Sequence, residues 1–205
     1  IFLKVIRVDM RLTLGLARAR PAALLTGFAF GIGLWFAASL LLHALASDWA
    51  PVNNPAMEWL SSNITALAQE PDTAVLLFLG LAVAPAICEE FLFRGVALSA
   101  FRQRAKPWVA ITVSATLFSL YHLNIYQMPN TFVIGLVLGW LTLRCGSIWP
   151  AVLLHALHNG LSLAFHISSP SGGTPSLWLY LLLIGPIAGF VLLRSGLADK
   201  PSTSS

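Results

Sequence analysis

Long apolar stretches separated by short polar segments make up most of this chain of 205 residues. A helix that crosses the hydrocarbon core of a bilayer, about 30 Å thick, needs about 20 predominantly apolar residues. The apolar stretches therefore predict six spanning helices, of which the third and fourth are short. The predicted spans are Ala22–Ala46, Thr73–Ala100, Trp108–His122, Thr131–Leu143, Ser147–His166 and Leu177–Leu193.

The composition indicates that lipid is the solvent for much of the chain. Hydrophobic residues make up 57% of the sequence and charged residues only 10%, whereas soluble domains carry about a quarter charged residues. The formal net charge of +4 comes from basic residues at the ends of predicted spans. Membrane topology explains this charge, so we expect no nucleic-acid partner. The predicted fold is all-α, a polytopic transmembrane helical bundle in contact with membrane lipid.

Charges at the ends of the spans predict their orientation. If the basic segment before the first span is cytoplasmic, six spans place every basic residue except Arg94 on the cytoplasmic side. Both chain termini then lie in the cytoplasm, and the short loops favour an integral protein of a bacterial membrane. The later basic residues on that side are Arg102, Arg104, Lys106, Arg144, Arg194 and Lys200, and the acidic residues opposite are Asp48, Glu58, Glu70 and Asp72.

The domain organisation has three predicted parts. Residues 1–21 form a basic amphipathic segment, residues 22–197 a transmembrane domain, and residues 198–205 a polar tail. Residues 51–69 carry an apolar stripe at helical spacing, so they are either an amphipathic helix on the outer membrane face or an ordinary loop with some helix. Because the chain begins with Ile1, we expect it to be part of a longer protein, and a fusion to or association with another membrane domain stays open.

Three charged residues fall inside the second span. Each charge at mid-helix costs about 2.5–3.5 kcal/mol on insertion scales, so such residues persist when they pair or do chemistry. Glu90 and Arg94 are four apart and can form an ion pair on one helix face. Glu89 is turned about 100° away and has no obvious local partner. Pro85, one turn earlier, predicts a kink. The alternative is that these charges only join helices.

Two further motifs place histidines in apolar surroundings. His122 ends the sequence FSLYH, and it could be an ordinary interfacial group. His155 and Asn159 are four apart in HALHN and face the same way, with His158 offset from them. Packing of polar side chains between helices is the alternative for this pair. The depth of each motif along its helix allows all of them to meet in the outer half of the bilayer.

Together these motifs resemble the CPBP intramembrane protease family, also called the type II CAAX prenyl endopeptidase or Abi family. They read CEEFLFRG at Cys88–Gly95, FSLYH at Phe118–His122 and HALHN at His155–Asn159. The family pattern is a glutamate pair with arginine four residues after the second, then Phe-x-x-x-His, then His-x-x-x-Asn. The resemblance covers about residues 73–166, and it rests on all three motifs in order because each alone is weak.

The resemblance implies an endopeptidase with its active site within the membrane, acting on a membrane-anchored protein or peptide. It implies that a glutamate acts as general base on a water, and that histidine and asparagine stabilise the oxyanion. Two alternatives stay open: a non-catalytic scaffold or bacteriocin-immunity module of the same fold, and a proton-coupled transporter. The implied catalytic residues are Glu89 and His122, which activate water, and His155 and Asn159, which bind the oxyanion; Glu90 and Arg94 support them.

The same residues raise the question of a metal. Glu89, His122 and His155 would make a carboxylate and two-histidine set that suits a catalytic zinc ion with an open water position. They can equally activate water without a metal. No HExxH motif is present to decide the matter, and the sequence slightly favours the metal-free reaction.

Overall fold

The structure is a computed structural model that describes residues 14–46, 55–125 and 127–168, and every regular element in these ranges is a helix. Helices form at five of the six predicted spans. The sixth span, Leu177–Leu193, lies outside the described residues, as do residues 1–13 of the basic segment and the tail 198–205. The helices are α3 (Pro21–Ala46), α4 (Pro55–Leu67), α5 (Pro71–Phe78), η1 (Leu79–Val83), α6 (Ala84–Glu90), η2 (Phe91–Leu98), α7 (Ser99–Arg102), α8 (Pro107–Tyr121), α9 (Met128–Cys145) and α10 (Trp149–Ser168).

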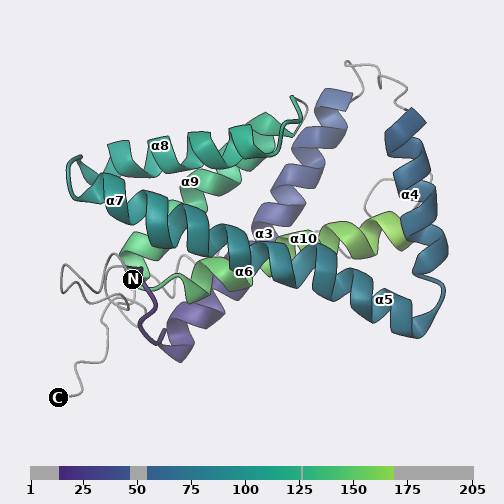
Figure 1. Cartoon of the computed structure of the whole chain (residues 1–205), viewed down its shortest axis with the longest axis horizontal. Coiled ribbons are helices and arrows are strands. Elements are labelled where there is room, and N and C mark those ends of the chain that lie inside the picture. The colour runs from purple at the N-terminus through teal and green to yellow at the C-terminus, as the bar shows by residue number, and fades with distance from the viewer. Residues whose placement is uncertain (1–13, 47–54, 126, 169–205) are drawn as a thin grey trace, which may run out of the picture.

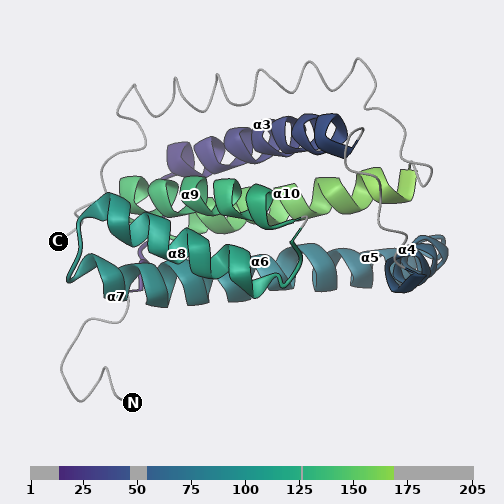
Figure 2. The same ribbon diagram turned by 90° about the horizontal axis from the view of Figure 1, so that it is seen from above.

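Helix α10 lies at the centre of the bundle. It contacts α3, α9 and the η1–α6 segment. The three helices cross in Figure 1, and Figure 2 shows α3 on one side of α10 and the continuous helix α5–α7 on the other. Helices α8 and α9 pack together beside η2. The main core cluster joins α3, η2, α8, α9 and α10 through Ala23, Phe93, Phe118, Ile134, Leu138, Leu141, Cys145, Ala151 and Leu154.

The continuous helix from Pro71 to Arg102 is long and apolar enough to cross a membrane, and so is α9. Only 17% of the most apolar window of Pro71–Arg102 is buried inside the protein. The core helix of a soluble protein would be mostly buried, so this outward apolar surface fits lipid. The apolar helices Pro21–Leu34 and Pro107–Tyr121 are shorter. Within the described residues two helices thus qualify as spans, and the six predicted spans are not shown.

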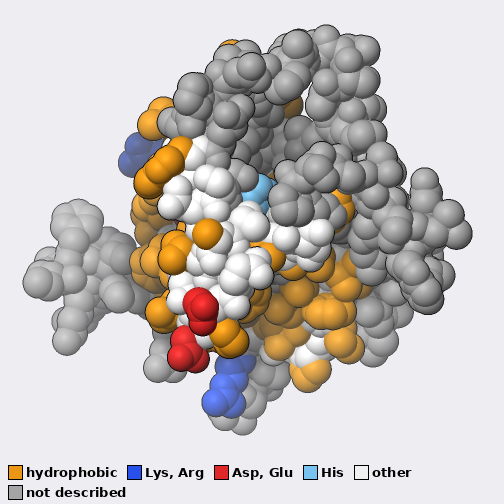
Figure 3. Space-filling model, turned by 90° about the vertical axis from the view of Figure 1, so that its right-hand side faces the viewer, with side chains coloured by type: hydrophobic (Ala, Val, Ile, Leu, Met, Phe, Trp, Pro, Cys, Tyr) orange, Lys and Arg blue, Asp and Glu red, His pale blue; other side chains and the backbone are white. Residues whose placement is uncertain are grey.

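Charged side chains lie at opposite ends of the bundle. The basic residues near the start of α3, around the α7–α8 link and at the end of α9 lie at one end (Figures 1 and 2). Glu70 and Asp72, at the start of α5, are exposed at the other end, which Figure 3 faces and where acidic side chains are visible. This separation follows the pattern that the sequence predicts for a spanning bundle.

Within the segment 51–69, residues Pro55–Leu67 form helix α4, which is compatible with both interpretations of this segment. It lies across the acidic end of the bundle, beside the start of α5 (Figures 1 and 2). Trp59 on this helix is 67% exposed. A helix in this position suits a membrane surface, where tryptophan is enriched, and its location on the outer face stays a prediction.

The helix that carries the glutamates is irregular on both sides of them. A π-helical turn, Leu79–Val83, ends two residues before Pro85, and a second π-helical segment, Phe91–Leu98, follows Glu90. Proline lacks the N–H that an α-helix needs at this point, and a wider turn before it accommodates the missing bond. Such turns recur at functional sites. The kink predicted at Pro85 thus takes the form of a change in helix type.

Close contact between α3 and α10 depends on Gly27. A Cβ atom there would overlap the backbone oxygen of Pro150 and lie 3.1 Å from its Cα. We expect Gly27→Ala to lower the free energy of unfolding by about 1–3 kcal/mol, because backbone atoms cannot move aside as a flexible side chain can. The matched control is Gly80→Ala, where an added Cβ meets nothing within 4 Å. Unfolding in detergent micelles measures both, and equal stability of the two variants would contradict this packing.

Candidate active site

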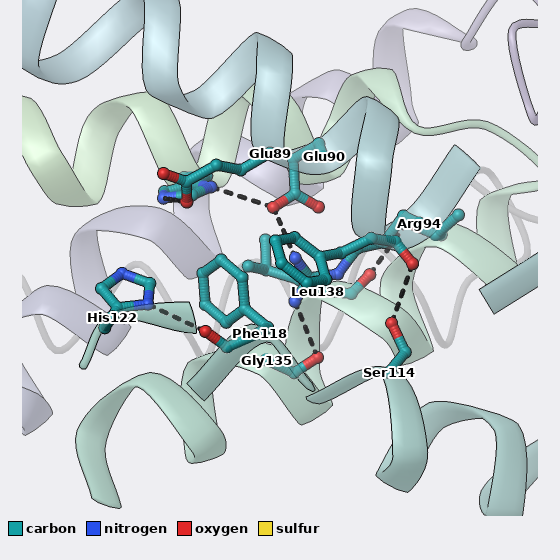
Figure 4. A network of polar contacts seen from close by, with 11 residues as sticks. Glu89, Glu90, Arg94, Ser114, Phe118, His122, Gly135 and Leu138 are labelled. Atoms are coloured by element: carbon teal, nitrogen blue, oxygen red, sulfur yellow. Dashed lines mark hydrogen bonds and ion pairs between the residues drawn. The ribbon is translucent and has the colours of Figure 1, made fainter. Parts of the chain in front are cut away.

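A buried ion pair lies at the centre of the site. Arg94 Nη1 donates to Glu90 Oε1 at 2.8 Å, and both side chains are fully buried. This is the ion pair predicted from their four-residue spacing. Arg94 Nη2 also donates to the carbonyl oxygen of Gly135 at 3.1 Å, and the guanidinium lies 4.4 Å from the ring centroid of Phe118 (Figure 4). Three helices therefore hold one arginine.

The ring of His155 lies between the two glutamates. Its Nδ1 is 2.9 Å from Glu90 Oε1, and its Nε2 is 3.8 Å from Glu89 Oε2. The Glu90 carboxylate, which accepts a hydrogen bond from Arg94, has no proton to donate to His155. The proton of the bond between Glu90 and His155 is therefore on His155 Nδ1. The 3.8 Å separation is too long for a direct hydrogen bond, and it suits a water that bridges the two groups.

His122 is held by the backbone of its own helix. Its Nδ1 is 2.9 Å from the carbonyl oxygen of Phe118, and because a carbonyl only accepts, this nitrogen carries the proton. In the neutral ring Nε2 is then an acceptor. The Phe118 ring touches His122 and His155 edge-on, with centroids 4.9 and 5.5 Å away. One aromatic side chain thus packs against both imidazoles.

A cavity of about 430 Å³ brings the four predicted catalytic residues together. Glu89 is 17% exposed, and its Oε2 is buried without a hydrogen-bond partner in the described residues. Convergence of the three motifs, expected from their depth, is therefore present, while the role of each residue stays a prediction. The cavity is lined by Leu81, Pro85, Glu89, Phe118, His122, Gln127, Asn130, Thr131, Ile134, His155, His158, Asn159 and Ser162.

Several site residues were missed by the sequence interpretation. Ser114 donates to the carbonyl oxygen of Phe93 at 2.8 Å, which ties α8 to η2 next to the arginine. Ser119 donates to the carbonyl oxygen of Met128 at 2.7 Å, which fixes the start of α9 beside the cavity. Hydroxyl groups in apolar helices carry the same signal as the histidines, because each needs a partner in lipid. His158, which is offset from His155 on the helix, also lines the cavity, and the sequence predicts no role for it.

The donor set does not fit a three-ligand metal site in this arrangement. Within the described ranges, no group of three His, Cys, Asp or Glu side chains is placed to hold an ion. A catalytic zinc ion is usually held by three protein ligands, and among the described residues Glu89 is paired with His155. Zinc held by Glu89, His122 and His155 stays a prediction from sequence, and no step below uses it.

Comparison with known proteins identifies part of the chain. Residues 71–161 match the model of a family described as type II CAAX prenyl endopeptidase, Rce1-like. For this similarity we call residues 71–161 the Rce1-like domain. The match runs from the start of α5 into α10 and contains the ion pair, both motif histidines and Asn159. The predicted limits of the transmembrane domain, 22–197, extend beyond the matched residues and stay a prediction.

One relative and a search of solved structures complete the comparison. The chain is 32% identical over 100 residues to a protein of Escherichia coli described as an uncharacterized 24.3 kDa protein. That alignment covers 46% of this chain and 46% of the relative, so the chain spans about half of that protein's length. No solved structure matches the chain. The printed description of the family that residues 71–161 match is that of an endopeptidase.

Proposed function

We propose that the Rce1-like domain is an intramembrane endopeptidase in which Glu89 and His155 activate a water molecule. The observation that carries this proposal is the pair formed by Glu89 Oε2 and His155 Nε2, 3.8 Å apart on the wall of a cavity. Both atoms can accept a hydrogen bond from a water between them. Intramembrane ionisable groups of this kind mark chemistry by default, since each is costly in lipid.

In the proposed reaction, Glu89 removes a proton from this water while the water oxygen attacks the scissile carbonyl carbon. The carbonyl π electrons move to its oxygen, and amide donors lining the cavity stabilise that oxyanion. Collapse of the intermediate breaks the C–N bond, and the leaving nitrogen takes the proton from Glu89. The products are a carboxyl group and an amine. Glu90 and Arg94 do not touch the substrate: they hold His155 in the orientation that faces Glu89.

The proposed substrate is a membrane-anchored protein or peptide. The cavity of about 430 Å³ lies between helices, so it admits an extended segment and excludes a folded domain. The basic end of the bundle lies in the cytoplasm in this proposal, as the positive-inside rule requires. The protein is then an integral protein of a bacterial membrane, and the active site opens within the bilayer.

Reconstitution tests this function. We expect the purified protein in liposomes to cleave a membrane-anchored peptide, and mass spectrometry of the products would identify one hydrolysed amide bond. A proton-coupled transporter would instead show flux driven by a pH gradient and no cleaved product. Absence of cleavage over a library of anchored peptides, with the protein folded, would contradict the proposal.

A further inference from the structure

A second cavity, of about 730 Å³, lies between α3, α10 and the segment from α5 to α6. Every residue that lines it is apolar or glycine. On α10 it is lined by residues at helical spacing from Trp149 to Leu161, which face away from the catalytic cavity. Phe78 and Ile87 in its wall are 46% and 44% exposed. We call this cavity the apolar groove, and exposed apolar surface of this kind marks contact with a membrane or a ligand.

The length of the apolar groove matches one leaflet of a bilayer. From Trp149 to Leu161 the groove follows α10 for about 18 Å, at 1.5 Å per residue. The hydrocarbon core of a bilayer is about 30 Å thick, so one leaflet contributes about 15 Å. Trp149 lies at the basic end of the groove and is 40% exposed, as suits a tryptophan at the level of the lipid headgroups. The groove can therefore cover one acyl chain that lies along α10.

Two arginines lie at the basic end of the apolar groove. The backbone N–H of Leu24, which lines the groove, donates to the carbonyl oxygen of Arg20 at 3.1 Å, so Arg20 lies one helical turn away. The hydroxyl of Ser147 donates to the carbonyl oxygen of Ala17 at 2.8 Å, which ties the segment with Arg18 to the start of α10. Arg18 is exposed. Within residues 14–46, 55–125 and 127–168, no acidic side chain forms an ion pair with Arg18 or Arg20.

We propose that the apolar groove, together with Arg18 and Arg20, binds an anionic phospholipid. One acyl chain lies in the groove, and the phosphate accepts hydrogen bonds from the guanidinium groups, whose planar geometry suits phosphate oxygens. Basic pockets between membrane helices recognise anionic headgroups in this way. A zwitterionic lipid offers the same chains without net charge, so the arginines select the anionic lipid. The bound chain packs against α6 and α10, which carry Glu89 and His155 on their other faces.

Native mass spectrometry of the full chain in detergent micelles tests the headgroup preference. The probes are phosphatidylglycerol and phosphatidylcholine with the same acyl chains. We expect the first phosphatidylglycerol to bind about 10-fold or more tightly than the first phosphatidylcholine, because each arginine near a membrane surface contributes about fivefold. Replacing Arg18 and Arg20 together by glutamine should abolish this preference.

The matched control removes two positive charges at the same end of the bundle but away from the apolar groove. Arg104 and Lys106 lie in the link between α7 and α8, and both are exposed. Replacing both by glutamine should leave the preference for phosphatidylglycerol within two-fold. An equal loss in the two double variants would overturn the inference, because net charge alone would then explain the binding. Equal affinity of the unmodified chain for the two lipids would overturn it as well.

A third pair of variants tests the acyl chain. Ala156 lines the apolar groove and is half-buried, so the ring in Ala156→Phe takes the place of several methylene groups of the lipid. We expect it to weaken the binding of both lipids about 10-fold or more. The control is Val109→Phe on α8, an exposed apolar position outside the groove, and it should bind both lipids as the unmodified chain does.

Thermal unfolding in detergent shows whether Ala156→Phe is folded, and if it is not, the arginine variants decide the inference. Unchanged affinity in a folded Ala156→Phe would overturn it, and the groove would then be covered by another occupant, such as the predicted span Leu177–Leu193. All of these measurements follow bound lipid and not cleavage. The lipid site and the proposed function can therefore fail independently of each other.

Discussion

Glu89→Gln is expected to lower kcat for peptide cleavage about 10³-fold, within the range that general base catalysis contributes. Glutamine keeps the size and polarity of the side chain but cannot take a proton from water. Glu89 Oε2 has no hydrogen-bond partner to lose in the described residues, so the fold should persist and KM should change little. The measurement is the rate of product formation in liposomes under saturating substrate.

The matched control for this experiment is Glu70→Gln. Glu70 is an exposed carboxylate at the start of the same continuous helix, and the same substitution there should leave kcat within two-fold. If Glu89→Gln retained kcat within a few-fold of the unmodified enzyme, another group would be the base. A non-catalytic scaffold of the same fold would keep its function in both variants.

Arg94→Met is expected to lower the free energy of unfolding by about 3–5 kcal/mol, the usual cost of leaving one buried charge without its partner. The lost contacts are the bonds to Glu90 and to the Gly135 carbonyl, both away from solvent. Methionine fills much of the arginine's apolar volume, so the loss reports the charge and not a cavity. Unfolding with SDS in mixed micelles measures it.

Two further variants test this explanation. Arg102→Met changes an exposed arginine at the end of the same continuous helix, and we expect a change within about 0.5 kcal/mol, as for most surface substitutions. Adding Glu90→Gln to Arg94→Met should recover part of the lost stability, because it removes the unpaired buried carboxylate. A double variant less stable than Arg94→Met would show that Glu90 stabilises the fold by another route.

The positions and lengths of the helices can be predicted from the sequence, because each helix follows an apolar stretch. The second predicted span, Thr73–Ala100, lies within the helix Pro71–Arg102, and the fifth, Ser147–His166, overlaps α10 to within two residues at each end. The central position of α10 was not predictable. It depends on contacts between distant segments, such as the approach of Gly27 to Pro150, and no local pattern encodes such a pairing.

The site shows the same division between local and tertiary geometry. The Glu90–Arg94 pair follows from helical spacing alone, and the structure has it. The contact of His155 with Glu90 joins residues 65 apart in the chain, so only packing of α6 against α10 creates it. The family resemblance predicts that His122 helps to activate the water and that His155 binds the oxyanion. The geometry places His155 next to Glu89, and the expected division of roles stays a prediction.

The most direct test of the central claim is a double-mutant cycle on kcat with Glu89→Gln, His155→Gln and both together. Groups that act as a unit on one water lose most of their effect with the first substitution, so effects on the rate are strongly non-additive. The account predicts that the double variant cleaves no more slowly than the slower single variant. If the two losses in kcat multiplied, Glu89 and His155 would act independently, and a shared water between them would be ruled out.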